Sequence, residues 1–183
     1  MRRLIMWNLI TLDGYFEGAK PWDLPWHERV WGEELERFSL EQLGSADALV
    51  FGRMTYEGMA AHWQTATGEI ADTMNRLPKV VCSRTLENAT WNNTRVARDA
   101  GADVAKLKRE GDGDLYVFGS ADLSRSLMDA GLFDEYRIGI APVIHGAGRR
   151  LFDDGLQPKA LKLLDTRPLS NGCVILSYGP ERA

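Results

Sequence analysis

Two rhythms of apolar and polar residues alternate along this chain. Short apolar runs, which indicate buried strands, stand at residues 2–11, 48–51, 79–83, 115–118 and 136–140. Between these runs, apolar residues recur at spacings of three and four, which is typical of one face of a helix. Strands that alternate with helices predict a layered α/β fold.

Helix signals mark the segments between the strands. Pro25 suits the first turn of a helix, Ser120 suits an N-cap, and Gly131 suits a helix end. Segment 86–113 predicts a short strand near residues 94–96, followed by a helix. The predicted apolar faces are Trp31–Leu35–Phe38 in one helix from Pro25, Tyr56–Met59–Ala60–Trp63, Val104–Leu107, and Leu123–Leu127–Ala130.

The last part of the chain predicts a β-hairpin. Strand-like runs at 159–166 and 173–178 flank Asn171-Gly172, and Asn-Gly between such runs is a strong hairpin signal. We therefore expect a mixed, mostly parallel sheet with helices on both faces and antiparallel strands at one edge. The length fits one domain over residues 1–183.

Composition and charge narrow the class of protein. Of the 183 residues, 44% are hydrophobic and 26% are charged, and the formal net charge is −4 with scattered basic residues. Such a chain lacks the basic stripe of nucleic-acid-binding proteins, and its apolar runs are shorter than the ~20 residues that span a bilayer. The N-terminus lacks the features of a signal peptide, so we expect a cytoplasmic protein. Two cysteines in strand-like runs and three dispersed histidines predict thiols and no metal site.

Three turns that suit a phosphate follow predicted strands directly. In open α/β sheets, ligands bind at the carboxyl ends of strands, where helix N-termini favour anions. Gly52-Arg53 offers a close backbone approach and a forked cation, Ser83-Arg84-Thr85 offers groups for a 2′-phosphate, and Gly119-Ser120 repeats the strand–glycine–helix order. Each turn also fits an ordinary connection, and none matches the Rossmann or P-loop motif.

The order of these pieces resembles the dihydrofolate reductase superfamily. The likeness covers nearly the whole chain and is carried by Thr11–Tyr15, Gly52–Glu57, Lys79–Ser83, Gly119-Ser120 and Gly131–Phe152. It is greatest to the branch that contains the reductase domain of riboflavin biosynthesis proteins. The resemblance implies a three-layer dihydrofolate reductase-like fold, a homodimer, and NADPH as the hydride donor. It places cofactor contacts at Gly52, Arg53, Met54, Thr55, Ser83, Arg84, Thr85, Gly119, Ser120, Ala121 and Leu123.

The same resemblance locates the substrate near the first strand and the loop after it. We expect substrate contacts from Asn8, Asp13 and Trp22, although Asp13 also fits a residue that fixes the loop. The segment from Trp22 to His27 is similar to the dihydrofolate reductase sequence Trp-x-Leu-Pro-x-Asp, with His27 in place of the acid. Imidazole cannot accept two hydrogen bonds side by side as a carboxylate does, which argues against dihydrofolate. His27 is either a catalytic proton donor or a partly exposed helix histidine.

Two functions remain open from the sequence. The first is an NADPH-dependent reductase of a small heterocycle, either a pterin or 5-amino-6-ribosylaminouracil phosphate, in folate or riboflavin metabolism. The phosphorylated substrate would need a second anion site, which the sequence does not locate. The second is a nucleotide-binding protein of the same fold without catalysis, suggested by the missing acid at position 27. A pure interaction module fits poorly with three phosphate-type turns. For Arg149 and Arg150, surface or dimer contacts are expected.

Overall fold

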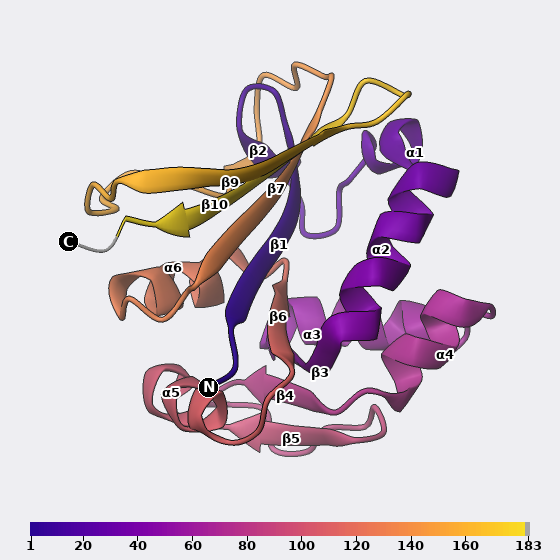
Figure 1. The fold of residues 1–183 in the computed structure, drawn as a ribbon. Helices are drawn as coiled ribbons and strands as arrows, with labels where there is room; N and C mark the ends of the chain where they lie inside the picture. The colour runs from indigo at the N-terminus through magenta and orange to yellow at the C-terminus, as the bar shows by residue number, and fades with distance from the viewer. Residues whose placement is uncertain (182–183) are drawn as a thin grey trace.

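An eight-stranded sheet forms the centre of this computed structural model, which describes residues 1–181. The strands lie in the order β5–β4–β3–β6–β1–β7–β10–β9 (Figure 1). In this order, the six strands from β5 through β7 all run parallel, whereas β10 is antiparallel to both of its neighbours, β7 and β9. Their bounds are β1 (Leu4–Thr11), β3 (Ala46–Gly52), β4 (Lys79–Cys82), β5 (Thr94–Ala97), β6 (Asp114–Phe118), β7 (Glu135–Ala141), β9 (Leu161–Pro168) and β10 (Val174–Pro180). The predicted mixed sheet with a terminal hairpin is thus confirmed.

Helices cover both faces of this sheet. Helices α1 (His27–Val30), α2 (Glu33–Ser45), α3 (Arg53–Trp63) and α4 (Glu69–Arg76) lie on one side, and α5 (Ala100–Arg109) and α6 (Ala121–Asp129) lie on the other (Figure 1). A separate short ladder pairs β2 (Tyr15–Glu17) with β8 (Arg149–Arg150). Of the residues described, no helix is long and apolar enough to span a membrane.

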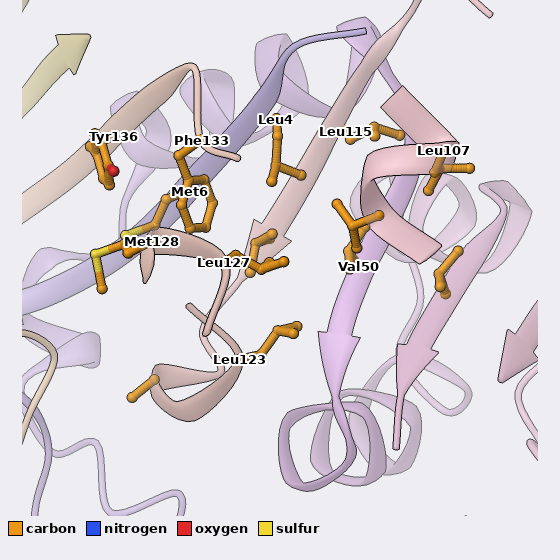
Figure 2. Packing of buried hydrophobic residues seen from close by; sticks show 14 of the residues in the cluster. Leu4, Met6, Val50, Leu107, Leu115, Leu123, Leu127, Met128, Phe133 and Tyr136 are labelled. Atoms are coloured by element: carbon orange, nitrogen blue, oxygen red, sulfur yellow. The ribbon is translucent and has the colours of Figure 1, made fainter. Parts of the chain in front are cut away.

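One core fills the space between the sheet and helices α5 and α6. Leu4, Val50 and Leu115 project from neighbouring strands toward Leu107 of α5 and Leu127 of α6 (Figure 2). Side chains of a strand alternate between faces, so the intervening residues form a second core against α2, α3 and α4. Full burial of each such leucine contributes roughly 1.5–3 kcal/mol. These two cores hold the sheet between its two layers of helices.

The predicted first helix is wrong in one respect, because it is two helices. Helix α1 ends at Val30, Trp31 and Gly32 are extended, and α2 begins at Glu33. Trp31 is therefore 52% exposed instead of lying on the apolar face, whereas Leu35 and Phe38 are buried as predicted. The low helix propensity of glycine favours the break at Gly32. The sequence predicted one helix because the spacing of the apolar residues stays helical across this break.

Other differences concern short or terminal elements. Helix α4, β2 and β8 were not predicted. Strands β2 and β8 have three residues or fewer and give little periodic signal, whereas the eight-residue α4 has an apolar face of Ile70, Ala71 and Met74 that went unrecognised. Ala130 is exposed just beyond α6 instead of extending its apolar face. The predicted strand at 94–96 and the helix after it are confirmed as β5 and α5. Strand β9 forms an exposed edge of the sheet, and the expected dimer stays a prediction.

Candidate active site

A cleft of about 1170 Å³ opens at the carboxyl ends of the parallel strands. We call its first part the turn half, formed by residues 52–55, 82–84, 98–101, 119–123 and 126, which lie at or after the ends of β3, β4, β5 and β6, together with Arg149. We call the second part the aromatic half, which lies between β1, the segment of residues 22–31, which includes α1, and helices α2 to α4. Because parallel strands point the same way, their turns meet at this edge.

Two helices begin in the turn half with free backbone N–H groups. Gly52, which has no side chain, stands at the N-cap of α3, and Ser120 stands at the N-cap of α6 without a capping bond from its hydroxyl among the described residues. Ser120 is the N-cap residue of α6, as predicted, but its backbone is left-handed (φ 61°) and its Oγ accepts the N–H of Gly52 at 2.8 Å. The hydroxyl therefore ties the two turns together. The uncapped N–H groups and the positive helix ends favour a phosphate.

Glycine keeps the space beside these helix ends open. Gly119 has a φ of +62°, and a Cβ there would lie 3.2 Å from Cγ2 of Thr55. A Cβ at Gly52 would lie 3.3 Å from Oγ of Ser120. A side chain at Gly119 would thus be strained by its backbone and crowded by the opposite turn. The turn half is shaped for a group that approaches the backbone closely.

Arginines outnumber carboxylates in the turn half, where Glu17, Asp99 and Asp122 also line the cleft. The arginines that line it are Arg53, Arg84, Arg98 and Arg149. Nη1 of Arg98 donates to the carbonyl of Ser83 at 2.9 Å, which joins the turns after β4 and β5. The hydroxyl of Ser83 accepts the N–H groups of Thr85 (3.2 Å) and Leu86 (3.0 Å), so it shapes its own loop. Guanidinium groups beside a hydroxyl suit a phosphate monoester.

Arg149, for which surface or dimer contacts were expected, also lines the cleft. Its guanidinium pairs with Glu17 at 3.6 Å and with Asp122 at the start of α6. Arg150, its neighbour in β8, instead donates to the carbonyl of Asp13 at 2.9 Å and lies over the ring of Tyr15. The β2–β8 ladder thus attaches one arginine to the cleft and the other to the loop after β1.

Tryptophan side chains dominate the aromatic half. Trp7, Trp22, Trp31 and Trp63 line it. The Trp22 ring lies against α3 so closely that a Cβ on Gly58 would fall 2.0 Å from it. Trp22 also has a φ of 67°, which is uncommon for a bulky residue. Flat aromatic walls favour a planar ring as the ligand.

Asn8 lies where the two halves meet. It follows Trp7, whose carbonyl accepts the N–H of Gly119 at 3.3 Å. Strand alternation puts Asn8 on the same face as Met6 and Ile10, and it is 3% exposed. Neither polar atom of its amide has a partner within residues 1–181. A buried amide without hydrogen bonds is costly, so a bound ligand would complete this position.

Asp13 lies outside the lining of the cleft. Its carboxylate accepts the hydroxyl of Thr11 at 2.6 Å and the N–H groups of His145 and Gly146. The Thr11 bond, supported by the two backbone bonds, lowers the pKa of Asp13 to about 2. Asp13 therefore holds the loop at residues 145–146 against the end of β1. Of its two expected roles, the contact geometry gives the loop-fixing one, and its substrate contact stays a prediction.

His27 is the first residue of α1 and lines the aromatic half. Burial lowers the pKa of its imidazole to about 4, so the ring is neutral near pH 7. A neutral imidazole offers one N–H donor and one acceptor nitrogen. With its ordinary pKa, His27 could be protonated near neutral pH, but desolvation of the partly buried ring prevents this, so His27 is not an imidazolium acid at neutral pH.

The structure brings most of the predicted site residues together. All of them except Asp13 and Thr85 line the cleft, while their individual roles stay predictions. Sequence reasoning missed Arg98 and the start of α5, although the strand–turn–helix order there matches the other turns. It also missed Gln42 on α2, for which no local motif exists. Within residues 1–181, no group of three or more His, Cys, Asp or Glu side chains is placed to hold a metal.

Comparison with known proteins places this chain in a family. The chain is 30% identical over 186 residues to Uncharacterized protein YyaP of Bacillus subtilis (strain 168), covering 97% of this chain and 94% of that protein. A putative riboflavin biosynthesis protein from Shewanella sp. PV-4 shares the fold with a TM-score of 0.81 at 19% identity, covering 98% of this chain and 99% of that one. Dihydrofolate reductase from Enterococcus faecalis, complexed with NADP(H), gives a TM-score of 0.67 at 14% identity, covering 98% and 97%. The dihydrofolate reductase-like fold is thereby confirmed. Residues 2–175 match the model of the RibD C-terminal domain, and the chain belongs to that family.

Proposed function

We propose that this protein is an NADPH-dependent reductase of a small heterocyclic substrate, a pterin or a ribosylaminouracil of folate or riboflavin metabolism. The observation that carries the proposal is the joining of two unlike half-sites in one cleft. The turn half offers arginines and free helix N-termini, and the aromatic half offers flat apolar walls. A charged dinucleotide and a planar ring would meet at Asn8, at the junction. Family membership supports this assignment.

The residues of the turn half fit the parts of NADPH. The N–H groups at the starts of α3 and α6, with the space kept open at Gly119, suit the diphosphate. Arg84 and Arg98 beside Ser83 suit the 2′-phosphate that distinguishes NADPH from NADH. When bound, the cofactor supplies the hydride. The unpartnered amide of Asn8 would bind a polar group at the junction.

The aromatic half would orient the substrate and exclude water. Its tryptophan rings stack on a planar substrate, and a dry environment strengthens the remaining polar contacts. His27, neutral near pH 7, would donate its N–H to an acceptor on the substrate. A proton needed at the substrate would pass through the partly exposed His27 ring, which would take up a proton from solvent on its acceptor nitrogen as it gives one up from the other nitrogen.

Selectivity between NADPH and NADH tests the cofactor assignment. We expect Arg84→Ala and Arg98→Ala each to weaken NADPH binding about 10- to 100-fold, because a hydrogen bond to a charged group contributes roughly 1.5–3 kcal/mol. NADH binding should change little. Arg109→Ala is the matched control, since Arg109 lies exposed at the opposite end of α5. The assay is a titration followed by the fluorescence of the reduced nicotinamide. Equal binding of both nucleotides by the native protein would refute the 2′-phosphate site.

A nucleotide-binding protein without catalysis is the second candidate. It is favoured by His27, which stands in place of an acid and is held neutral by burial. The two candidates differ in turnover. NADPH oxidation followed by absorbance with pterin, ribosylaminouracil phosphate and quinone acceptors should show turnover with at least one if the protein is a reductase. Tight NADPH binding with no oxidation by any acceptor would favour the non-catalytic protein.

A further inference from the structure

Gln42 presents a buried hydrogen-bond donor in the wall of the aromatic half. It lies on α2, lines the cleft and is 2% exposed. Its Oε1 accepts the N–H of Arg137 Nη1 at 3.4 Å, while its Nε2 has no acceptor among the described residues. The contact with the cation settles which end of the amide is oxygen, because a guanidinium can only donate. The amide NH₂ is therefore the end left without a partner.

Arg137 is itself held firmly in this orientation. Its guanidinium pairs with buried Glu135 and donates to the hydroxyl of Tyr116 at 3.0 Å. The charge of Arg137 is thus balanced by Glu135 behind the wall. Gln42 lies between this buried ion pair and the cleft, and its neutral amide NH₂ is the end without a partner among the described residues. An unmet buried N–H costs free energy, and an acceptor atom on a ligand would recover it.

The charges of the cleft are divided between its halves. All four arginines that line it belong to the turn half, and no Lys or Arg of residues 1–181 lines the aromatic half. The carboxylate of Glu28 is exposed at its mouth. A phosphate or carboxylate on a substrate would leave water for a wall of tryptophan without gaining a cation, which is unfavourable. This half therefore disfavours an anionic ligand.

We propose that the aromatic half selects an uncharged planar ring with a ring oxygen or nitrogen as acceptor, and that Gln42 donates to this acceptor. The proposal rests on the reductase assignment for the reaction itself. Within that assignment it chooses a pterin-like ring over a ribosylaminouracil phosphate. It makes Gln42 a specificity-determining residue, acting through a contact that no sequence motif marks.

Two fluorescent probes that differ by a single charge test this selection. Pterin is uncharged near pH 7, and 6-carboxypterin has the same ring with a carboxylate. Each is titrated with the protein, with and without saturating NADP⁺, and binding is followed by quenching of the pterin fluorescence. We expect pterin to bind at least about tenfold more tightly, because the carboxylate has no partner in this half.

Variants of α2 test the role of Gln42. Gln42→Leu and Gln42→Met keep the volume and should weaken pterin binding about tenfold, which is the loss of one hydrogen bond. Ser39→Ala is the matched control. Ser39 lines the same wall three residues earlier, but its hydroxyl donates to the carbonyl of Leu35 at 2.8 Å. Arg137 keeps Glu135 and Tyr116 in every variant, and thermal unfolding checks that each one folds.

The outcomes separate this proposal from the reductase assignment. Equal or tighter binding of 6-carboxypterin, or no binding of pterin, overturns the selection of an uncharged ring. Unchanged pterin binding by both folded Gln42 variants overturns the assignment of Gln42. If NADPH fails to bind while pterin binding without NADP⁺ remains selective and dependent on Gln42, the reductase assignment fails and the ring site stands.

Discussion

Mild acid, between pH 7.5 and 5, should destabilise this protein through His27. The imidazole lies at the start of α1 in the wall of the cleft, where burial lowers its pKa from the ordinary 6.5 to about 4. In the unfolded chain the same imidazole titrates with its ordinary pKa. Between these two values, the unfolded chain binds a proton that the folded protein does not. Acidification therefore favours the unfolded state.

The size of this effect follows from the two pKa values. The contribution of His27 to stability is complete above pH 6.5 and is lost as the pH falls toward 4. Lowering the pH from 7.5 to 5 should reduce the free energy of unfolding by about 2 kcal/mol through His27 alone. That is a large share of the roughly 5–15 kcal/mol that holds a typical domain folded.

Urea unfolding at pH 7.5, 6.5 and 5 would measure this loss. The native protein should lose about 2 kcal/mol more than His27→Gln, because glutamine does not titrate. His62→Gln is the control: His62 is exposed on α3, so this variant should lose as much as the native protein. If the native protein and His27→Gln lose the same free energy of unfolding on acidification, the His27 imidazole is well hydrated. His27 would then be available as an acid near neutral pH, and its imidazole would no longer indicate a neutral aromatic half.

Two further substitutions test the packing around the cleft. Gly58→Ala should weaken pterin binding but leave NADPH binding unchanged, because its methyl group would displace the Trp22 ring; Gly44→Ala, a helix glycine with open space around it, should change neither. Lys79→Met should lower the free energy of unfolding by about 3 kcal/mol in urea, because it removes the buried ammonium that donates to three carbonyls at the end of α4 at 2.7–3.1 Å. The exposed Lys106→Met should cost far less, and a similar cost for both lysines would contradict this account.

The turns of the cleft could be predicted from the sequence because their signals are local. In each turn, a short apolar strand, a glycine or serine and the start of a helix follow one another directly in the sequence. The order of these segments along the chain indicated the fold. The same local reading failed at Trp31 and Gly32, where helical spacing continued across an extended break. Ser120 was correctly predicted at the N-cap of α6, but the partner of its hydroxyl, the distant Gly52, carries no local signal.

The residues that determine ligand chemistry depend on contacts far apart in the chain. Gln42 acquires its orientation from Arg137, and Trp22 acquires its position from a helix that begins thirty-one residues later at Arg53. In the sequence, Gln42 is one polar residue of an amphipathic helix, and His27 is a histidine of ordinary pKa. Folding buries the Gln42 amide and desolvates the His27 ring, and neither effect is visible in the sequence.

The low pKa of His27 and the proposed selection against anions have one physical cause. The apolar wall that includes Trp7, Trp31 and Trp63 stabilises the neutral form of any group that enters it, whether that group is an imidazole of the protein or a carboxyl of a ligand. On the side of the turns, arginines and helix ends do the opposite and favour charge. The acid-unfolding and pterin experiments therefore measure the same property from two sides. Agreement between them would place the boundary between charged and neutral chemistry at the junction occupied by Asn8.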